Sequence, residues 1–260
     1  MISLITILLI SQIICDCPKI VKKGGGSSPG FCTRYWDCCK PSCAWNHNSR
    51  SCDMKQNVET NPYITSICGG GTSTTCLSQI PFMVDGCDMG FAFVATPGSE
   101  GGNDNCGRCF LFTFTGEGHW KTTAQTQALK GKQLVVMTTN IGYDVEPGQF
   151  DVMIPGGGVG LFNGCDHLFG SNNMGVQYGG LLTECLDVKK ASDPVQCLKE
   201  GCQKAFSNVP EALKGCMWHV NFLESADNPS MTFEEIECPD VLNLLLLEKD
   251  IGKQPLKLKL

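Results

Sequence analysis

The chain has 260 residues, a formal net charge of −6 and 18 cysteines. The acidic balance argues against a nucleic-acid-binding protein, because such proteins carry basic faces. The cysteine content is far above ordinary usage and favours an oxidising compartment. The length fits one large domain or two small ones. Together these properties predict an acidic, disulfide-rich, secreted protein.

The first elements in chain order are a leader and a linker. Residues 1–14 are almost purely apolar, too short a run to span a bilayer, and have the length of the hydrophobic region of a signal peptide. We therefore expect a cleaved secretory signal at 1–17, with cleavage near Cys15 to Pro18, and a short Gly/Ser/Lys linker at 18–30. No later segment is apolar for long enough to anchor the chain, so an extracellular monomer without a membrane anchor is expected.

The segment from Thr33 to Trp45 contains an unusual mixture of side chains. It combines an acid, Asp37, with three aromatic residues, three cysteines and the cations Arg34 and Lys40. A buried core strand would not contain so many charges, because buried charges are costly without partners. Aromatic faces stack on sugars, a carboxyl group moves protons, and cysteines fix both to a frame. The segment predicts a polymer-binding wall that contains a catalytic acid.

Short segments with apolar side chains at every second position follow, separated by glycine-rich turns. The segments expected as strands are 91–94, 110–115, 134–140, 150–154, 218–223 and 231–237. Residues 194–207 instead show helical spacing, and a second short turn runs from Pro210 to Gly215. The pattern predicts a mostly β domain at 31–243, a closed barrel with long loops and one small helical insertion, followed by a tail at 244–260.

A second carboxyl group is found in the segment that begins Gln149-Phe150-Asp151 and runs into the glycines at 156–158. In a strand, Phe150 and Val152 share one face and Asp151 points to the other. Burial beside apolar groups would raise the pKa of this acid, which suits a proton donor. A residue that caps a turn is an equally good interpretation from spacing alone. Asp144 lies on the adjoining loop and would bias the proton of Asp151 by like charge.

These segments closely resemble glycoside hydrolase family 45, the small secreted endoglucanases. The resemblance runs in order from about Gly30 to Leu242. It rests on Thr33–Trp45, Phe150–Gly160, Phe162–Cys165, Tyr178–Gly180, Gly215–Trp218 and Ala226–Ser230. It implies a six-stranded double-psi β-barrel with an open groove, stapled by disulfides, and inverting hydrolysis of internal β-1,4-glucosidic bonds in cellulose-type glucans.

The resemblance also implies roles for individual residues. Asp37 would be the general base, Asp151 the general acid and Asp144 an assisting carboxylate. In an inverting enzyme the two catalytic carboxyl groups stand roughly 6.5–9.5 Å apart, with room for water between them. One departure is Gln149, at a position where the best-known fungal members have histidine. The residues expected to bind substrate are Thr33, Arg34, Tyr35, Lys40, Trp45, Phe162 and Tyr178.

The resemblance further implies six disulfides: Cys38–Cys165, Cys39–Cys68, Cys43–Cys106, Cys52–Cys76, Cys109–Cys238 and Cys185–Cys216. Among the remaining cysteines we expect the pairs Cys32–Cys87 and Cys197–Cys202. Cleavage of the leader between Cys15 and Cys17 would leave an odd thiol.

Other features of the sequence allow more than one interpretation. A zinc site at Cys106 and Cys109 is disfavoured because no second Cys or His pair lies at ligand spacing, and no metal or organic cofactor is expected. Trp120 would either stack on a sugar or cover the core, and the second interpretation is favoured. The rival functions are hydrolysis of xyloglucan or mixed-linkage β-glucan, and non-hydrolytic wall loosening of the expansin kind. The presence of Asp37 argues against the latter, because expansins lack that base.

Overall fold

The structure is a computed structural model, and it describes residues 17–98, 105–170, 174–247 and 258–259. Its strands are β1 (Ser28–Tyr35), β2 (Phe82–Val84), β3 (Gly90–Pro97), β4 (Cys109–Gly118), β5 (Gln133–Gly142), β6 (Gln149–Met153), β7 (Pro229–Ile236) and β8 (Leu258–Lys259). The α-helices are α1 (Ala124–Ala128), α2 (Cys165–Phe169), α3 (Gly180–Thr183), α4 (Pro194–Ala205), α5 (Pro210–Asn221) and α6 (Asp240–Leu247). Shorter helical turns are η1 (Ser42–Asn46), η2 (Ile67–Gly69), η3 (Leu77–Gln79) and η4 (Glu184–Val188).

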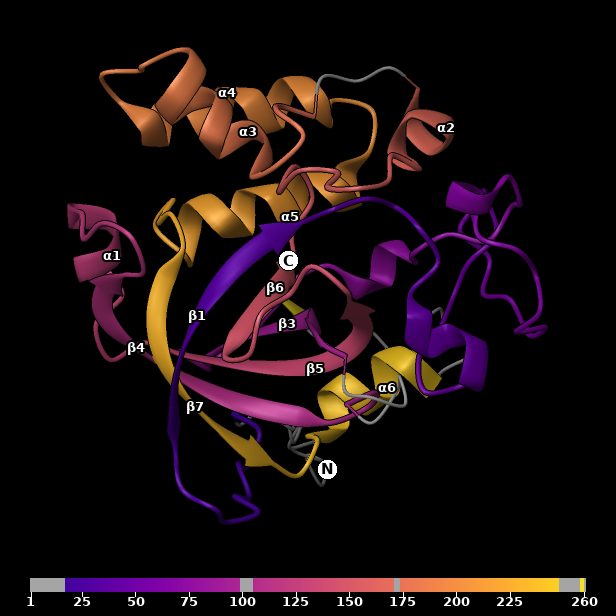
Figure 1. Cartoon of the computed structure of the whole chain (residues 1–260), viewed down its shortest axis with the longest axis horizontal. Coiled ribbons are helices and arrows are strands. Elements are labelled where there is room, and N and C mark those ends of the chain that lie inside the picture. The colour runs from indigo at the N-terminus through magenta and orange to yellow at the C-terminus, as the bar shows by residue number, and fades with distance from the viewer. Residues whose placement is uncertain (1–16, 99–104, 171–173, 248–257, 260) are drawn as a thin grey trace, which may run out of the picture.

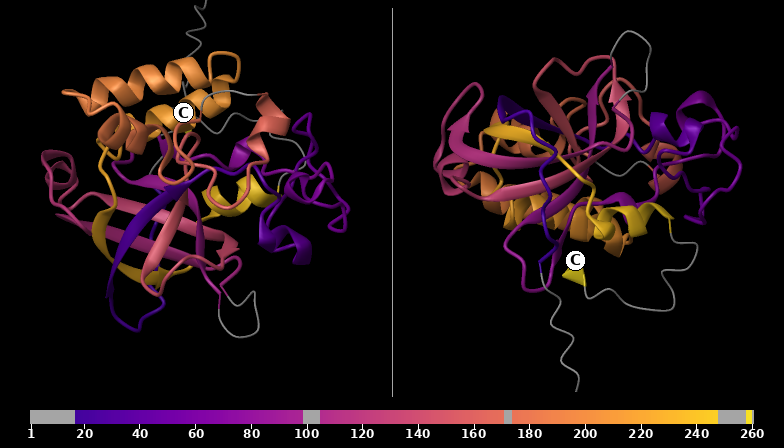
Figure 2. Two further views of the ribbon diagram at one scale, coloured as in Figure 1. Left: turned by 45° about the horizontal axis from the view of Figure 1, so that its top comes forward. Right: turned by 90° about the horizontal axis from the view of Figure 1, so that it is seen from below.

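Six strands close into a barrel. The hydrogen-bonded order is β5-β4-β7-β1-β6-β3, and β3 also pairs with β5, which completes the ring. The pairs β1–β6 and β3–β5 are parallel, whereas β4 pairs antiparallel with both β5 and β7. Figure 1 shows this ring, with α3, α4 and α5 gathered over one end of it. The left view of Figure 2 shows the same helical layer beside the barrel. The predicted double-psi β-barrel with a helical insertion is confirmed.

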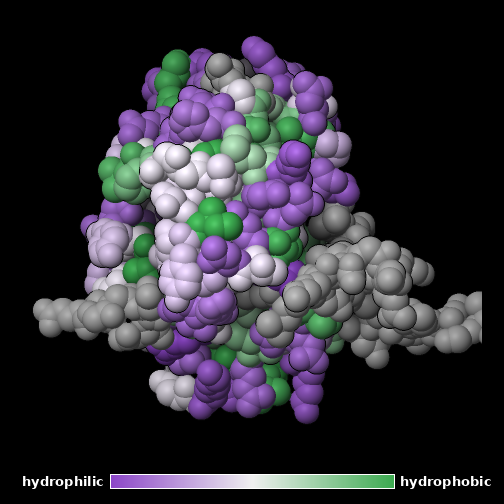
Figure 3. Space-filling view, turned by 90° about the vertical axis from the view of Figure 1, so that its right-hand side faces the viewer, coloured by the Kyte–Doolittle hydropathy of each residue, from purple (hydrophilic) through white to green (hydrophobic). Residues whose placement is uncertain are grey.

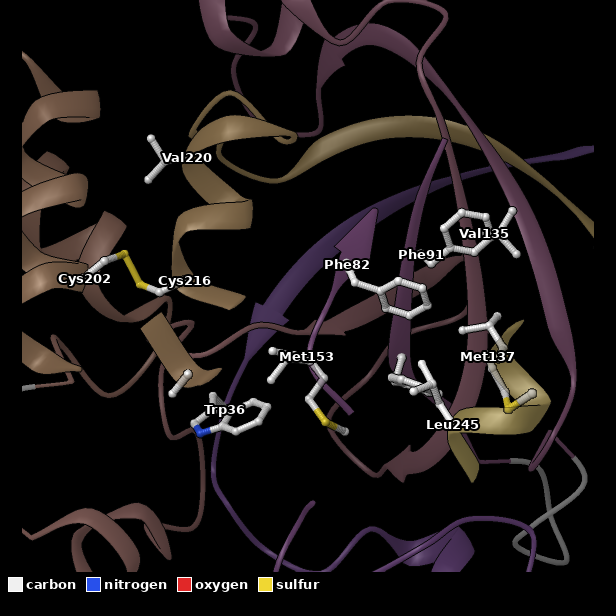
Figure 4. Packing of buried hydrophobic residues seen from close by; sticks show 14 of the residues in the cluster. Trp36, Phe82, Phe91, Val135, Met137, Met153, Cys202, Cys216, Val220 and Leu245 are labelled. Carbon is white, nitrogen blue, oxygen red and sulfur yellow. A yellow bond between two sulfur atoms is a disulfide. The ribbon is translucent and has the colours of Figure 1, made fainter. Parts of the chain in front are cut away.

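Both faces of the barrel strands are buried. Phe110, Phe112 and Phe114 belong to one hydrophobic cluster, and the intervening Leu111 belongs to another. The cluster that contains Leu111 joins strands β2, β3 and β5 to side chains of α4, α5 and α6. Figure 4 shows Phe82, Phe91, Val135 and Met137 packed together in it. Apolar burial contributes roughly 25 cal/mol per Å², so these clusters are the main source of the barrel's stability.

One predicted strand is a helix in the structure. Residues 218–223 were expected to be extended, but α5 continues from Pro210 to Asn221. Its buried positions Ala212, Cys216 and His219 follow helical spacing, and the Cys202–Cys216 disulfide joins α5 to α4. A short apolar run does not distinguish a strand from a buried helix, and here the contact with α4 decides.

The expected domain boundaries cut across two elements. β1 begins at Ser28, inside the expected linker at 18–30, and Lys22 forms a bridge with Ile236, the last residue of β7. At the other end, α6 extends to Leu247 and so enters the expected tail at 244–260. The expected signal peptide at 1–17 lies outside the described residues except for Cys17. No helix among the described residues is both long and apolar enough to span a bilayer.

Five of the six disulfides implied by the resemblance are present: Cys38–Cys165, Cys39–Cys68, Cys43–Cys106, Cys52–Cys76 and Cys109–Cys238. The first four brace the loops between β1 and β3, which form the mainly polar face seen in Figure 3. Because these loops have little regular structure of their own, the cross-links restrict the conformations available to them before folding.

The other three predicted pairs are wrong. Cys185 pairs with Cys197 and Cys202 pairs with Cys216, so neither Cys185–Cys216 nor Cys197–Cys202 forms. Cys87 pairs with Cys17, and Cys32 is a free, buried thiol. The helical layer explains the first two errors, because the cysteines on α4 face different neighbours: Cys197 meets the turn before α4, and Cys202 meets α5. Cleavage before Cys17 would retain the Cys17–Cys87 bond.

Candidate active site

Asp37 lies just beyond the end of β1, in a turn that is fixed covalently. The next residue, Cys38, has a φ of 61°, a left-handed conformation that is unfavourable for a residue with a Cβ. Cys38 is bonded to Cys165, and Cys39 is bonded to Cys68. Two adjacent cross-links to different segments therefore hold the Asp37 backbone in an otherwise disfavoured turn.

Hydrogen bonds fix the orientation of Asp37. Its Oδ1 accepts a bond from the Cys39 N–H at 2.9 Å, and its carbonyl accepts one from the Gly164 N–H at 2.9 Å. A Cβ at Gly164 would lie 2.8 Å from the Cys68 sulfur and 3.0 Å from that carbonyl, so only glycine fits there. The backbone donor at Cys39 favours the ionised form of the Asp37 side chain.

Asp151 is held in the middle of β6. Its neighbours Phe150 and Val152 are buried, and its backbone lies opposite Thr33 in the parallel pair β1–β6. The alternation expected from the sequence is therefore present. Thr33 donates a side-chain hydrogen bond to the Asp151 carboxyl group, and the other oxygen, Oδ1, is buried without a partner among the described residues. The described part of the protein therefore leaves one oxygen of this carboxyl group without a hydrogen bond.

Two adjoining cavities meet at the acidic residues. A cavity of about 230 Å³ is lined by Asp37, Tyr35 and Trp45 as well as by Asp144 and Asp151. A second cavity of about 440 Å³ is also lined by Asp144 and Asp151, but not by Asp37. Asp151 therefore stands where the two cavities adjoin. The structure brings the three predicted acidic residues together, and it leaves their catalytic roles as predictions.

The environment shifts both carboxyl groups in the same direction. Burial raises the pKa of Asp37 to about 7, against the opposing effect of its backbone hydrogen bonds and with a smaller contribution from the charge of Asp144. Burial also raises the pKa of Asp151 to about 7, and the charges of Asp144 and Asp37 add to this shift. The Thr33 hydroxyl and the Arg34 cation act in the opposite direction on the pKa of Asp151.

Trp45 forms a supported aromatic wall of the smaller cavity. Its side chain is 41% exposed, and the Lys40 ammonium lies 3.6 Å from the centre of its ring. Lys40 also donates hydrogen bonds to the carbonyls of Pro62 and Ile64. Lys40 was expected to bind substrate; it lines the smaller cavity but is only 5% exposed, and its contacts position Trp45.

Arg34 is likewise committed to the protein. Its side chain is 4% exposed and bonds to Asp227 at 2.8 Å, to the Thr183 hydroxyl at 2.9 Å and to the Gly179 carbonyl at 3.1 Å. Arg34 was also expected to contact substrate, and it lines the larger cavity. These bonds tie β1 to the segment that carries Tyr178, so its main contribution is to position that segment.

The remaining expected binding residues also line the two cavities. Tyr35 and Phe162 line the smaller one, and Thr33 and Tyr178 line the larger one. Burial raises the pKa of the Tyr35 hydroxyl, which accepts a hydrogen bond from Asn140 at 3.2 Å. The sequence did not single out several further lining residues, among them Asn140, Tyr143 and Leu161, and a core position was favoured for Trp120, which also lines a cavity.

Among the described residues, no group of three or more His, Cys, Asp or Glu side chains is arranged to hold a metal ion. Cys106 and Cys109, considered as a zinc pair, are each in a disulfide.

The closed barrel and its acidic, aromatic-lined groove define a double-psi barrel protein of the glycoside hydrolase class. The model of glycosyl hydrolase family 45 matches residues 29–245, and the chain belongs to this family.

Individual relatives agree with this assignment. The chain is 38% identical over 230 residues to an endoglucanase B from Cellvibrio japonicus, an alignment that covers 82% of this chain and 44% of that protein. The chain thus spans about half the length of that relative. It is 35% identical to an endoglucanase from Cryptopygus antarcticus, covering 85% of this chain and 89% of that one. The crystal structure of a cellulase from the same springtail superposes with a TM-score of 0.67 at 34% identity, covering 85% of this chain and 96% of that chain.

Proposed function

We propose that the protein is a secreted endo-β-1,4-glucanase that hydrolyses internal bonds of cellulose-type glucans with inversion of configuration. The observation that carries the proposal is that Asp37 and Asp151 line one open cavity together with the exposed ring of Trp45. Two carboxyl groups and an aromatic platform in one groove are what hydrolysis of a sugar polymer requires. The relatives named endoglucanase support the activity, and the disulfides support an extracellular location.

In the proposed reaction Asp151 gives its proton to the glycosidic oxygen while the bond from that oxygen to the anomeric carbon breaks. Asp37 removes a proton from a water molecule that attacks the same carbon from the opposite face. The products are a leaving sugar with a free hydroxyl and a new α-anomeric hydroxyl. Asp37 then carries a proton and Asp151 a charge, and exchange with solvent resets the pair. General acid and base groups each contribute roughly 10²–10⁴-fold.

The hydrogen bonds of the two carboxyl groups support this assignment of roles. Asp37 accepts a hydrogen bond from the backbone N–H of Cys39. This bond stabilises the Asp37 carboxylate, the form that acts as a base. Asp151 has an oxygen without a partner among the described residues, and the charges of Asp144 and Asp37 favour its protonated form. Asp151 is therefore the better holder of a proton near neutral pH. Asp144 assists by keeping that proton in place.

The test uses the purified secreted protein with carboxymethylcellulose and cello-oligosaccharides. Proton NMR of fresh products should show the α-anomer first, and Asp151→Asn and Asp37→Asn should each lower kcat by at least ~10²-fold while the proteins remain folded. The matched control is Asp187→Asn, at a carboxyl group whose side chain is 70% exposed on the helical layer. A β-anomer released first, or a folded Asp151→Asn variant with normal activity, would contradict the proposal.

Substrate choice is tested in the same assays. Xyloglucan and mixed-linkage β-glucan should be cut more slowly than carboxymethylcellulose. Faster cleavage of either polymer would identify it, and not cellulose, as the preferred substrate. Loss of wall stiffness without new reducing ends would indicate the expansin-like alternative. No feature of the groove favours these alternatives over the endoglucanase.

A further inference from the structure

Trp120 is an exposed aromatic residue at the end of the larger cavity. It lies between β4 and α1, its side chain is 70% exposed, and it lines the cavity with Tyr178 and Asp151. The sequence interpretation assigned it to the core, and the structure contradicts this. An isolated exposed tryptophan needs no explanation. Trp120 is different because it is supported from beneath and borders a cavity that contains the acid.

The support is an aromatic stack built on β1. The rings of Phe31 and His119 are stacked with their centres 3.7 Å apart. The ring of Trp120 meets both edge-to-face, with its centre 4.6 Å from that of His119 and 5.9 Å from that of Phe31. Aromatic pairs in these arrangements contribute about 0.5–1.5 kcal/mol each beyond their burial. The position of the Trp120 ring is thus set before any ligand arrives.

The backbone around Trp120 is fixed as well. The His119 N–H bonds to the Asn228 carbonyl at 2.9 Å, and the Thr122 hydroxyl accepts a bond from the Gly118 N–H at 3.2 Å. Immediately afterwards, Thr123 and Thr126 form reciprocal capping bonds at the start of α1. A side chain that is held in place on a rigid loop binds a ligand at a lower entropic cost than one on a mobile loop.

β1 relates this platform to the acid. Phe31 and Thr33 are two residues apart, so their side chains lie on the same face of the strand, and Thr33 lies opposite Asp151. Two residues of a strand span about 6–7 Å. Phe31, at the base of the platform, is therefore two residues along β1 from the position opposite the acid. It lies on the side away from Asp37, which follows the C-terminal end of the strand.

We propose that Trp120 is a stacking platform for a β-linked glucosyl unit on the leaving-group side of the bond that is cut. The apolar C–H face of such a pyranose ring would lie against the indole. The side follows from the two cavities: Asp37 must be near the anomeric carbon, and it lines only the smaller cavity, so the sugars beyond Asp151 occupy the larger one. This inference rests on the proposed function and adds a binding position to it.

The experiment compares Trp120→Ala, Trp120→Phe and the control Tyr63→Ala, which removes an aromatic side chain that is 80% exposed and lines neither cavity. With cellohexaose labelled at its reducing end, Trp120→Ala should lower kcat/KM about 10-fold, which corresponds to ~1.4 kcal/mol. It should also shift cleavage toward shorter labelled products, because longer leaving groups lose their contact. Cellotriose should be affected less than 2-fold, and Trp120→Phe should retain most of the wild-type pattern.

A binding measurement separates this inference from the proposed function. In the Asp151→Asn background, adding Trp120→Ala should weaken cellohexaose binding about 10-fold, whereas adding Tyr63→Ala should not change it. An active wild type with unchanged rates, product pattern and binding in Trp120→Ala would overturn only the platform. An equal loss on short and long substrates would also overturn it, because it would indicate a structural role. A wild type inactive on every β-glucan would instead overturn the proposed function.

Discussion

The side-chain amide of Gln149 donates a hydrogen bond to the Thr33 hydroxyl oxygen at 2.8 Å. The orientation of that amide is set on its other side, because its oxygen accepts the Glu146 backbone N–H at 2.9 Å. Since Gln149 Nε2 can only donate, the Thr33 hydroxyl must send its own proton elsewhere, and Asp151 is its partner. The Glu146 backbone N–H, on the loop that carries Asp144, thus sets the direction of the hydrogen bond from Thr33 to Asp151, the proposed acid.

This chain of bonds predicts the effect of Gln149→Leu. Without the amide, the Thr33 oxygen is free to accept a hydrogen bond from the protonated Asp151 carboxyl group instead of donating one to the carboxylate. The pKa of Asp151 should therefore rise. The alkaline limb of the kcat/KM profile should move up by ~0.5–1 pH unit. The matched control is Gln196→Leu on the exposed face of α4. A lower kcat with an unmoved limb would show that Gln149 acts only on structure.

Lys40→Met should weaken substrate binding while leaving the chemical step unchanged. Lys40 holds the Trp45 ring from below and bonds to the carbonyls of Pro62 and Ile64. Without these contacts the ring is less well positioned, so KM for cello-oligosaccharides should rise ~3–10-fold with kcat within 2-fold. Lys55→Met, on an exposed lysine of the same disulfide-rich loops, is the control. An equal fall in kcat would place Lys40 in the chemical step.

Asp151→Asn should stabilise the fold at alkaline pH. The folded-state pKa of Asp151, about 7, lies above the value of 3.8 for an unperturbed carboxyl group, so the folded state binds more protons between these values. Stability from this group is complete below pH 3.8 and is lost as the pH rises through 7. A neutral amide avoids that loss. Because the side chain is only partly buried, we expect the variant to gain ~1–2 kcal/mol at pH 8 and little at pH 4.

Thermal or urea unfolding of both proteins at pH 4 and pH 8 provides the measurement. The comparison between the variant and the wild type is needed because buried His219 acts in the opposite direction. Burial lowers the pKa of His219 to about 3, so its contribution is lost as the pH falls from 6.5. That contribution is common to both proteins and cancels in the difference. A stabilisation larger at pH 4 than at pH 8 would contradict the assigned shift.

Cys32 should be protected from thiol reagents in the folded protein. Its side chain is 2% exposed on β1, it forms no disulfide, and burial raises the pKa of its thiol well above the ordinary range. Reaction requires the exposed thiolate, so maleimide should label Cys32 only in denaturant. Non-reducing peptide mapping of the same sample should recover Cys185–Cys197 and Cys202–Cys216. Fast labelling under native conditions, or a peptide joining Cys32 to Cys87, would be inconsistent with this structure.

Local patterns and the family resemblance predicted much of this molecule. The alternation around Asp151 places it on the face opposite Phe150 and Val152, because side chains in a strand point to alternate sides whatever surrounds them. The segment from Thr33 to Trp45 is distinctive enough to indicate the family and, through it, five disulfides. These features depend on residues close in sequence or on a motif.

Other features were decided only by contacts between distant segments. Residues 218–221 are helical because Cys216 and its neighbours pack on α4, and the partners of Cys185 and Cys202 follow from the same packing. The sequence suggests that the charges of Lys40 and Arg34 are free to bind substrate. In the structure Lys40 bonds to a carbonyl group and Arg34 to a carboxylate, each from a segment distant in sequence. The exposure of Trp120 depends likewise on where Phe31 and Asn228 lie, and sequence periodicity carries no information about such encounters.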